Sequence, residues 1–321
     1  MNRTLASRLL PLLATALVLV GLFAAAGATY DHFLSLRVVL NLFKDRAFLG
    51  VVAVGMTFVI LSGGIDLSVG AVMAFTTVFI ASMMGTHGWP APAAIAVAVA
   101  IGTTFGLFQG WIIHHFRIPA FLVTLAGMFL ARGMAFVVSP GSIEIRDAFY
   151  DDLGERGVPL GDGLLLTVGP LIFLLLLATG MVVAHGTRFG RNVYALGGSE
   201  TSAALMGLPV AGTRIAVYAL CGGCAALGGV ISTLALSSGD PTRGTGLELD
   251  AIAATVIGGT ALTGGRGWLF GTFLGVLILG TIKMILDFDG SLDPAWLRLA
   301  SGGLLLAFIL LQKLVARQSV S

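Results

Sequence analysis

Long apolar runs separated by short polar stretches dominate the chain. Six of these runs are almost free of charge and have about the 20 residues that a helix needs to cross the hydrocarbon core of a bilayer. They lie at 9–29, 91–113, 118–138, 163–184, 215–236 and 294–312. Each run predicts one membrane-spanning helix.

Two further apolar blocks, 47–84 and 250–287, are too long for one crossing. Both contain Ser or Thr, then Gly-Gly, then another Gly after five intervening residues, at 62–70 and 263–271. We expect each block to form two short spans joined at the glycines, which gives ten spans, or eight spans and two re-entrant segments. Backbone that leaves a helix inside a bilayer must pack in protein or line a cavity, so such breaks are typical of transporters, and the shared pattern suggests an internal repeat.

Composition restricts the class of protein. Hydrophobic residues make up 57%, charged residues only 11%, and the mean hydropathy is +0.99. A soluble domain carries about 25% charged residues, so we expect an all-α polytopic membrane protein with one transmembrane domain over 1–321. The net charge of +2 is too small to indicate a nucleic-acid partner.

Two motifs that resemble metal sites are better explained by structure. Cys221 and Cys224 lie in an uncharged run, and we expect them to behave as small buried hydrophobes. His114 and His115 are adjacent, point to different helix faces and have no third ligand nearby, so they indicate the polar end of a helix. We therefore predict no metal site. Two series of glycines, 102, 106, 110 and 267, 271, 275, predict close helix packing.

The distribution of charge predicts the orientation. The 139–163 loop carries six acidic and two basic residues, whereas 185–214 carries three arginines and one glutamate. Because cytoplasmic loops are enriched in Lys and Arg, 185–214 should be cytoplasmic and 139–163 periplasmic, with both termini inside. Arg3, Arg8 and the following apolar run imitate a signal peptide, but an uncleaved first helix is the simpler interpretation.

The cytoplasmic segment 187–213 predicts a short amphipathic helix. Ser199 is suited to cap it, Glu200 lies in its first turn, and Gly207 ends it. A plain surface loop would explain the polarity but not Leu205, Met206 and Leu208. Apolar residues displayed in this way favour docking of a partner protein.

Four segments, 55–70, 118–133, 188–207 and 249–267, resemble the ribose/galactose-type sugar permeases of bacterial ATP-binding-cassette (ABC) importers. The resemblance covers nearly the whole chain in order and implies the ABC importer permease fold, in the bacterial inner membrane. Parts of the second and third segments are most similar to the second permease subunit of galactofuranose importers. In that subgroup the membrane core is taken to be a heterodimer.

The resemblance also implies roles and partners. The partners would be an ABC ATPase subunit, a second permease subunit in a heterodimer or homodimer, and a periplasmic sugar-binding protein. ATP and Mg would be bound by the ATPase, with no cofactor in this chain. ATPase coupling would fall on Tyr194, Gly197, Gly198, Glu200, Ala204 and Gly207. Arg266 and Trp268 depart from the small or apolar residues expected after the second glycine pair, so the two blocks need not be equivalent in function.

The chain has no Gly-Lys-Ser or Gly-Lys-Thr phosphate loop, so a separate ATPase would drive alternating access. A neutral sugar requires hydrogen-bonding side chains rather than a nucleophile or a metal. The candidates for the translocation pathway or the helix break are Gly63, Gly64, Asp66, Ser68, Thr57, Gln109, Thr124 and Asn41.

Two roles are open for Asp66. It can accept hydrogen bonds from the amides of Val69 or Gly70 and cap the next helix, which we favour, or it can contact sugar. Arg132, Lys283 and Arg298 lie near the outer ends of spans, where snorkelling explains them better than sugar contact.

Alternatives from other classes remain at this stage. Broken helices and a buried aspartate also suit an ion-coupled secondary transporter. An intramembrane enzyme is disfavoured because no span contains a Gly-x-Ser-x-Gly, a His-Glu-x-x-His or a paired carboxylate element. We therefore predict a transport subunit rather than an enzyme. Ribose or another pentose or hexose is the alternative substrate to a galactofuranose-like sugar.

Overall fold

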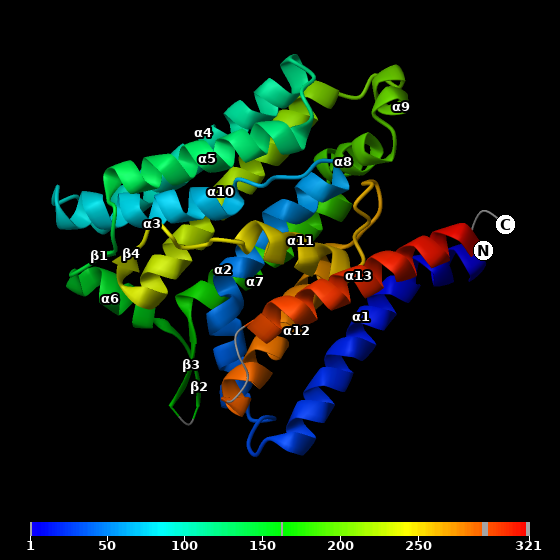
Figure 1. The fold of residues 1–321 in the computed structure, drawn as a ribbon. Helices are drawn as coiled ribbons and strands as arrows, with labels where there is room; N and C mark the ends of the chain where they lie inside the picture. Colours follow the sequence, from blue (N-terminus) through cyan, green and yellow to red (C-terminus); the bar gives the residue numbers. More distant parts are fainter. Residues whose placement is uncertain (1, 162, 291–294, 319–321) are drawn as a thin grey trace.

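The computed structural model describes residues 2–161, 163–290 and 295–318 and shows a bundle of helices (Figure 1). Ten helices correspond to the ten predicted segments. They are α1 (Asn2–Thr29), α2 (Leu36–Leu61), α3 (Val69–Gly85), α4 (Ala91–His115), α5 (Ala120–Val138), α7 (Val168–Gly186), α10 (Val210–Leu236), α11 (Leu247–Ile257), α12 (Leu269–Asp289) and α13 (Ala295–Gln318). The all-α polytopic fold class is confirmed.

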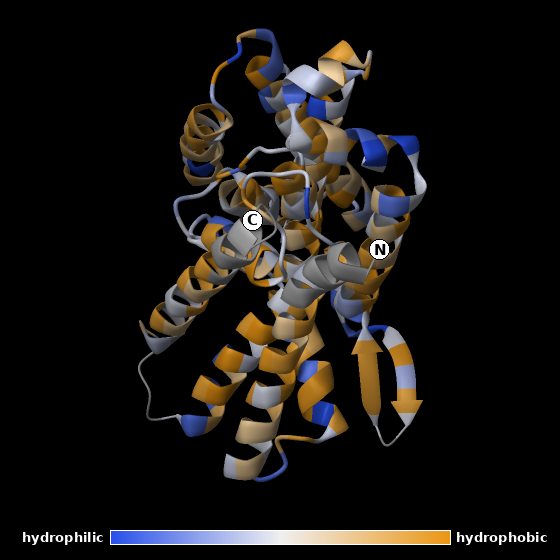
Figure 2. Cartoon of the chain, turned by 90° about the vertical axis from the view of Figure 1, so that its right-hand side faces the viewer, coloured by the Kyte–Doolittle hydropathy of each residue, from blue (hydrophilic) through white to orange (hydrophobic). Residues whose placement is uncertain are grey.

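Six of the described helices are long and apolar enough to cross a membrane: α1, α4, α5, α7, α10 and α12. Figure 2 shows that hydrophobic residues extend along the long helices, while hydrophilic residues gather toward helix ends and connecting segments. The number of ten crossings stays a prediction, because the four other helices do not meet the same criterion of length and composition.

Both long apolar blocks break at the predicted glycines, but their halves are unequal. The first half is not a short span: α2 has 26 residues and begins at Leu36, where the Ser35 side chain accepts a hydrogen bond from the Val38 amide. A capped start of this kind satisfies an amide that the helix leaves unpaired. In the second block, α11 has only 11 residues.

The predicted outer loop 139–163 contains regular structure. Asp147 caps α6 (Ala148–Glu155) by accepting a bond from the Tyr150 amide, and β2 (Gly157–Gly161) pairs with β3 (Leu164–Thr167). The hairpin delays α7 until Val168, five residues after the predicted start at 163. Two-residue strands β1 (Ile143–Glu144) and β4 (Ser238–Gly239) also pair, so this loop is joined to the end of α10.

Helix α10 is the centre of the core and packs against α4, α2 and α3. A Cβ at Gly106 of α4 would meet the Tyr218 carbonyl of α10, so the glycine allows the two backbones to touch. The same packing holds at Gly102 and Gly110, and between α12 and α11 at Gly271 and Gly275. Of the six glycines predicted to lie on packed helix faces, only Gly267 was wrongly placed, because it lies in the loop before α12.

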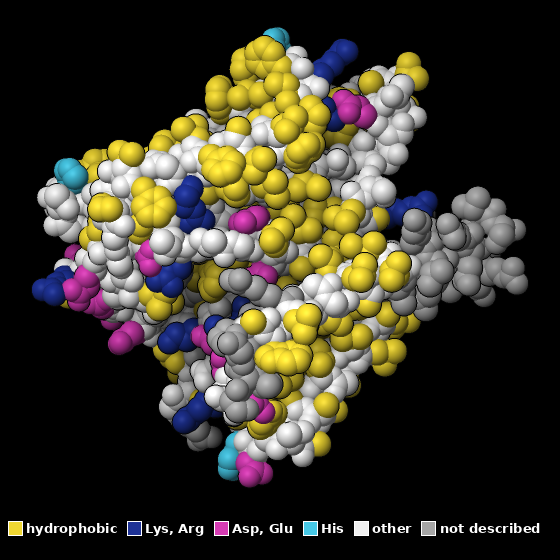
Figure 3. Space-filling model, viewed as in Figure 1, with side chains coloured by type: hydrophobic (Ala, Val, Ile, Leu, Met, Phe, Trp, Pro, Cys, Tyr) yellow, Lys and Arg dark blue, Asp and Glu magenta, His cyan; other side chains and the backbone are white. Residues whose placement is uncertain are grey.

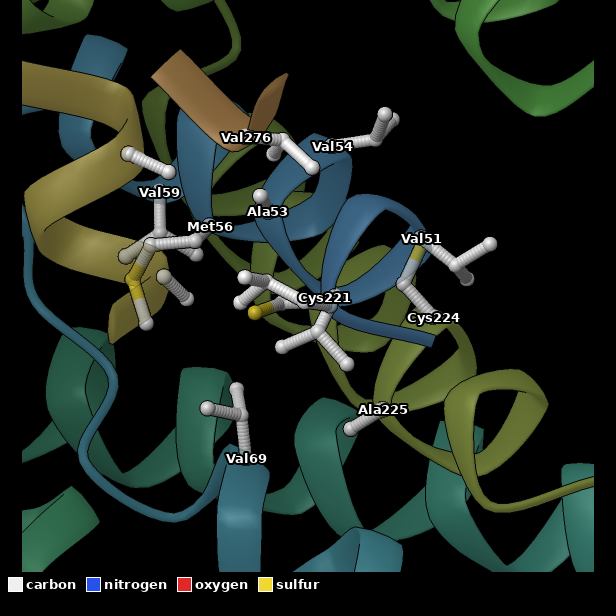
Figure 4. Close-up of a cluster of buried hydrophobic side chains, with 14 of the residues drawn as sticks. Val51, Ala53, Val54, Met56, Val59, Val69, Cys221, Cys224, Ala225 and Val276 are labelled. Carbon is white, nitrogen blue, oxygen red and sulfur yellow. The ribbon is translucent and has the colours of Figure 1, made fainter. Parts of the chain in front are cut away.

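Cys221 and Cys224 lie in this core as free, buried thiols, beside Val51 and Met56 (Figure 4). Among the described residues no group of three His, Cys, Asp or Glu side chains could hold a metal ion. His115 ends α4 and stacks on Trp111, with ring centroids 5.2 Å apart.

Candidate transport and coupling site

The first helix break follows from local backbone chemistry. Ser62 closes α2, and its hydroxyl donates to the Val59 carbonyl at 2.7 Å. Gly63 then adopts a φ of +82°, a conformation that glycine reaches without steric cost. The chain runs without helical structure until Val69, where α3 begins.

Asp66 is 1% exposed within this break and organises the next turn. Its Oδ1 accepts hydrogen bonds from the Ser68 amide at 2.8 Å and the Ser68 hydroxyl at 2.7 Å. Asp66 therefore forms an Asx turn with Ser68. The expected bonds from the amides of Val69 or Gly70 are not made. Asp66 supports the residue that caps α3 rather than capping the helix itself.

Gln109 of α4 joins the same polar group. Its Nε2 donates to the Ser68 hydroxyl at 3.0 Å, and Gln109 is 3% exposed. Gly127 of α5 lies against the Gln109 amide, and both residues line a cavity of about 330 Å³ between α4 and α5. The rest of the lining includes Phe105, Phe108 and Leu130, so the cavity is mostly apolar.

Thr124 and Tyr218 close the break from two sides. Both hydroxyls reach the Ile65 carbonyl, at 3.4 Å from Thr124 and 3.5 Å from Tyr218. The Tyr218 hydroxyl also occupies the space that a side chain on Gly64 would need. The sequence prediction missed Tyr218, because no local motif marks a tyrosine within an apolar helix as a partner of a distant break.

Two predicted pathway residues do not belong to this group. Thr57 is 0% exposed and lies within hydrogen-bond distance of Thr272, at 2.8 Å, so it joins α2 to α12 in the core. Asn41 is exposed near the start of α2, 21 residues before Ser62, which corresponds to about 30 Å along a helix. The structure therefore brings together Asp66, Ser68, Gln109 and Thr124 but not Thr57 or Asn41.

Three glycine pairs meet where the two breaks approach α8 (Arg188–Gly198). The Gly265 amide donates to the Leu61 carbonyl at 2.9 Å, which ties the second break directly to the end of α2. A Cβ on Gly264 would lie 2.8 Å from the Gly63 Cα, and a Cβ on Gly197 would meet Leu61 and Gly265 backbone atoms. Only glycines allow three backbone segments to approach this closely.

Tyr194 fixes α8 to the second break. Its hydroxyl donates to the Gly267 carbonyl at 2.9 Å. The His185 ring stacks on Tyr194, with centroids 5.9 Å apart, and also packs on Trp268 at 4.7 Å. Burial raises the pKa of Tyr194 to about 12, so the donating proton stays in place at neutral pH.

Two capped helices form the predicted cytoplasmic segment. Ser199 caps α9 (Glu200–Leu205) by accepting a bond from the Ser202 amide at 3.2 Å, as the sequence predicts. Glu200 pairs with Arg214 of α10 at 2.5 Å, and this bond holds the pKa of the Glu200 carboxyl below its usual value. The segment ends earlier than 213, because α10 begins at Val210.

The α9 surface is apolar and exposed. Leu205 is 85% and Met206 67% exposed, while Ala204 and Gly207 are also exposed. Gly207 has a φ of +73° and ends the helix in the left-handed conformation. Of the predicted coupling residues, Tyr194, Gly197 and the backbone of Gly198 contact the helix breaks, whereas Glu200, Ala204 and Gly207 lie on the exposed side.

Arg132 of α5 does not snorkel. Its Nη1 donates to the carbonyls of Pro241 at 2.6 Å and Arg243 at 2.8 Å, so the guanidinium holds the loop between α10 and α11. Lys283 is exposed, and the side chain of Arg298 lies outside the described residues.

Broken helices, glycine-mediated contact between the breaks and an attached peripheral helix pair define a membrane transport protein. The chain belongs to the family described as branched-chain amino acid transport system / permease component, which matches residues 38–310. As a permease component it is a multi-pass transport subunit and not an enzyme.

Its relatives include three bacterial permeases. The inner membrane ABC transporter permease protein YjfF of Escherichia coli is 45% identical over 95% of this chain and 92% of its own length. The fructose import permease protein FruG of Bifidobacterium longum is 36% identical over 96% and 92%. The ribose import permease protein RbsC of E. coli is 39% identical over 85% of each chain. No solved structure gives a significant match.

Proposed function

We propose that this chain is the permease subunit of an ABC importer that carries a monosaccharide across the bacterial inner membrane. Permeases for fructose and ribose among its relatives support a sugar substrate. Within that class we propose a galactofuranose-like sugar, on the resemblance of two segments to the second permease of galactofuranose importers, with ribose or another pentose or hexose as the alternative.

The contact of α8 with both helix breaks supports this proposal most strongly. An ATPase bound to Leu205 and Met206 would act on α9, which follows α8 after Ser199 alone. Helix α8 in turn touches the first break through Gly197 and the second through Tyr194. Movement of the peripheral helices would therefore reach both breaks at once and alternate access to the pathway.

The proposed assembly contains an ABC ATPase that binds ATP and Mg, a second permease subunit and a periplasmic sugar-binding protein. A heterodimer is proposed for the membrane core, from the same resemblance, and a homodimer is the alternative. We also propose that both termini lie in the cytoplasm, on the support of the charge distribution in the sequence.

Reconstitution in proteoliposomes tests the proposal. The complex is purified with its native ATPase and supplied with binding protein, and uptake of radiolabelled galactofuranose, D-ribose, D-fructose and L-leucine is measured. We expect uptake of one sugar that requires ATP and does not occur on a sodium or proton gradient alone. Uptake of leucine instead of every sugar, or uptake on an ion gradient without ATP, would overturn the proposal.

A further inference from the structure

Charged side chains gather toward the C-terminal end of α5. Arg132 of α5 lies near Glu248 in the first turn of α11 and near Asp240 and Arg243 in the 237–246 loop. Arg132 stands six residues before the end of α5, or about 9 Å along a helix axis. Charged groups inside a membrane are costly and most often serve function.

The loop that carries this group is fixed from several sides. The Asp240 amide donates to the Thr77 hydroxyl of α3 at 3.1 Å, and Arg132 holds two loop carbonyls from α5. A Cβ at Gly70 would meet the Gly244 carbonyl and the Glu248 carboxylate. Gly70 therefore leaves room for Glu248 beside the start of α3, four residues after Asp66.

Several groups of this cluster have hydrogen-bonding capacity that the fold does not use. Only Nη1 of Arg132 is used in the two loop contacts, and Nε of Arg243 is buried without a hydrogen-bond partner. Glu248 is half-buried, so its carboxylate remains accessible in part. Figure 3 shows basic and acidic side chains gathered on this face, beside apolar surface.

Aromatic rings flank the charged group. Phe129 and Phe136 lie three residues before and four residues after Arg132, so all three share one face of α5. They are 67% and 43% exposed. Ligand sites for small molecules combine such aromatic surface with a few fixed polar groups.

We propose that Arg132, Arg243 and Glu248, with Phe129 and Phe136 beside them, form a binding subsite for the hydroxyl groups of the transported sugar. This inference rests on the proposed function and identifies the sugar contacts on the outer side of the pathway. Guanidinium N–H groups donate to sugar oxygens, and the carboxylate accepts from sugar hydroxyls. With Asp240 included, two positive and two negative charges balance, which suits a neutral ligand.

This assignment differs from the pathway predicted by sequence. Asp66, Ser68 and Gln109 are at most 3% exposed and are bonded to one another, so they hold the break. The charged group of Arg132, Arg243 and Glu248 instead lies beside the start of α3, where Gly70 faces Glu248. A sugar bound there contacts α5, α11 and the loop between α10 and α11.

Protection of an introduced cysteine from a thiol reagent tests the subsite directly. Leu249→Cys places a thiol beside Glu248 at a position that is 62% exposed, while the native Cys221 and Cys224 are 0% and 5% exposed. The complete complex in nanodiscs is labelled with a hydrophilic maleimide, without and with the sugar that the wild type takes up. At a sugar concentration about ten times the half-saturating value, labelling should slow about tenfold.

The control variants separate binding from folding. Glu248→Gln in the Leu249→Cys protein should weaken the protection about tenfold or more, because a charged acceptor is lost. Lys283→Gln removes an exposed charge elsewhere and should keep it, and Val158→Cys in the outer hairpin should show no protection. If Leu249→Cys does not assemble, Thr245→Cys, also exposed, replaces it.

The outcomes distinguish the inference from the proposed function. A wild type that takes up sugar while neither cysteine is protected would overturn the subsite alone. Equal protection in the Glu248→Gln variant would also overturn it. Protection by L-leucine, combined with no uptake of any sugar, would overturn the proposed function.

Discussion

At the scale of single residues, glycines determine the closest contacts, because they have no side chain between neighbouring backbones. Gly197 and Gly198 are adjacent in sequence, but the space that a side chain would occupy differs between them. A Cβ at Gly197 would collide with the Leu61 carbonyl and lie 2.5 Å from the Gly265 amide nitrogen, whereas a Cβ at Gly198 would have no atom within 4 Å. We therefore expect opposite effects on uptake when each of the two glycines is replaced by alanine.

Gly197→Ala should disrupt the contact between α8 and the two breaks. Backbone atoms cannot move aside as a flexible side chain does, and forced overpacking typically costs about 1–3 kcal/mol. We expect uptake to fall about five- to 150-fold, since each 1.4 kcal/mol corresponds to a factor of ten. Gly198→Ala is the matched control and should retain uptake. Equal activity of both variants would contradict the proposed coupling contact.

Asp66 offers a second test at this scale. Asp66→Asn keeps an acceptor oxygen for the Ser68 amide, whereas Asp66→Ala removes it and leaves buried donors of Ser68 without this acceptor, at a cost of about 1–3 kcal/mol. We expect the Asn variant to keep most uptake and complex yield and the Ala variant to lose both together. Uptake and yield are measured side by side. An Asn variant that assembles fully but does not transport would show that the negative charge itself is required.

At the scale of elements, helix α9 is attached to the bundle by few contacts. Its start is capped by Ser199 and paired through Glu200 to Arg214, and its apolar end at Leu205 and Met206 contacts little of the chain. An apolar surface outside the spans indicates a protein partner. The residues that hold α9 in place therefore differ from those that are exposed to a partner.

Leu205→Ser combined with Met206→Ser should reduce association with the ATPase without harming the fold. Both side chains are mostly exposed, so their replacement leaves no cavity. We expect copurification of the ATPase to fall about tenfold or more, as for truncation of interface hot spots of about 2 kcal/mol. Val158→Ser, on the β2–β3 hairpin, is the control. Undiminished copurification by the double variant would place the docking surface elsewhere.

At the scale of the whole molecule, the bundle separates two groups of short elements that lie outside the long helices. The α8 and α9 helices lie at one end, and the acidic α6 and the β2–β3 hairpin lie at the other (Figure 1). Both chain ends lie on the right of Figure 1, as α9 does. The predicted orientation requires this separation, because it assigns the two groups to opposite sides of the membrane.

Labelling from the two sides of the membrane tests that orientation. Leu205→Cys should react with an impermeant maleimide in inside-out vesicles, and Val158→Cys should react in intact spheroplasts. The two native cysteines are buried, so they should give little background. Reaction of both sites from the same side would refute the orientation, and reaction of each from the opposite side would reverse it.

The sequence by itself determined the elements of this protein. Apolar length predicts the spans, glycine pairs predict both breaks, and Ser199 predicts the start of α9. These signals are local, because a helix cap or a left-handed glycine depends on residues a few positions away.

The tertiary structure alone decided which of these elements touch. Residues 63, 197 and 265 meet although no local pattern relates them, and Arg132 binds a loop more than 100 residues away. Thr57 and Asn41 have the same polar character as Thr124, yet one lies in the core and the other at the far end of α2. Hydrophobicity determines that a helix is buried in membrane or protein. Which neighbour each face of the helix contacts depends on how all the helices pack together.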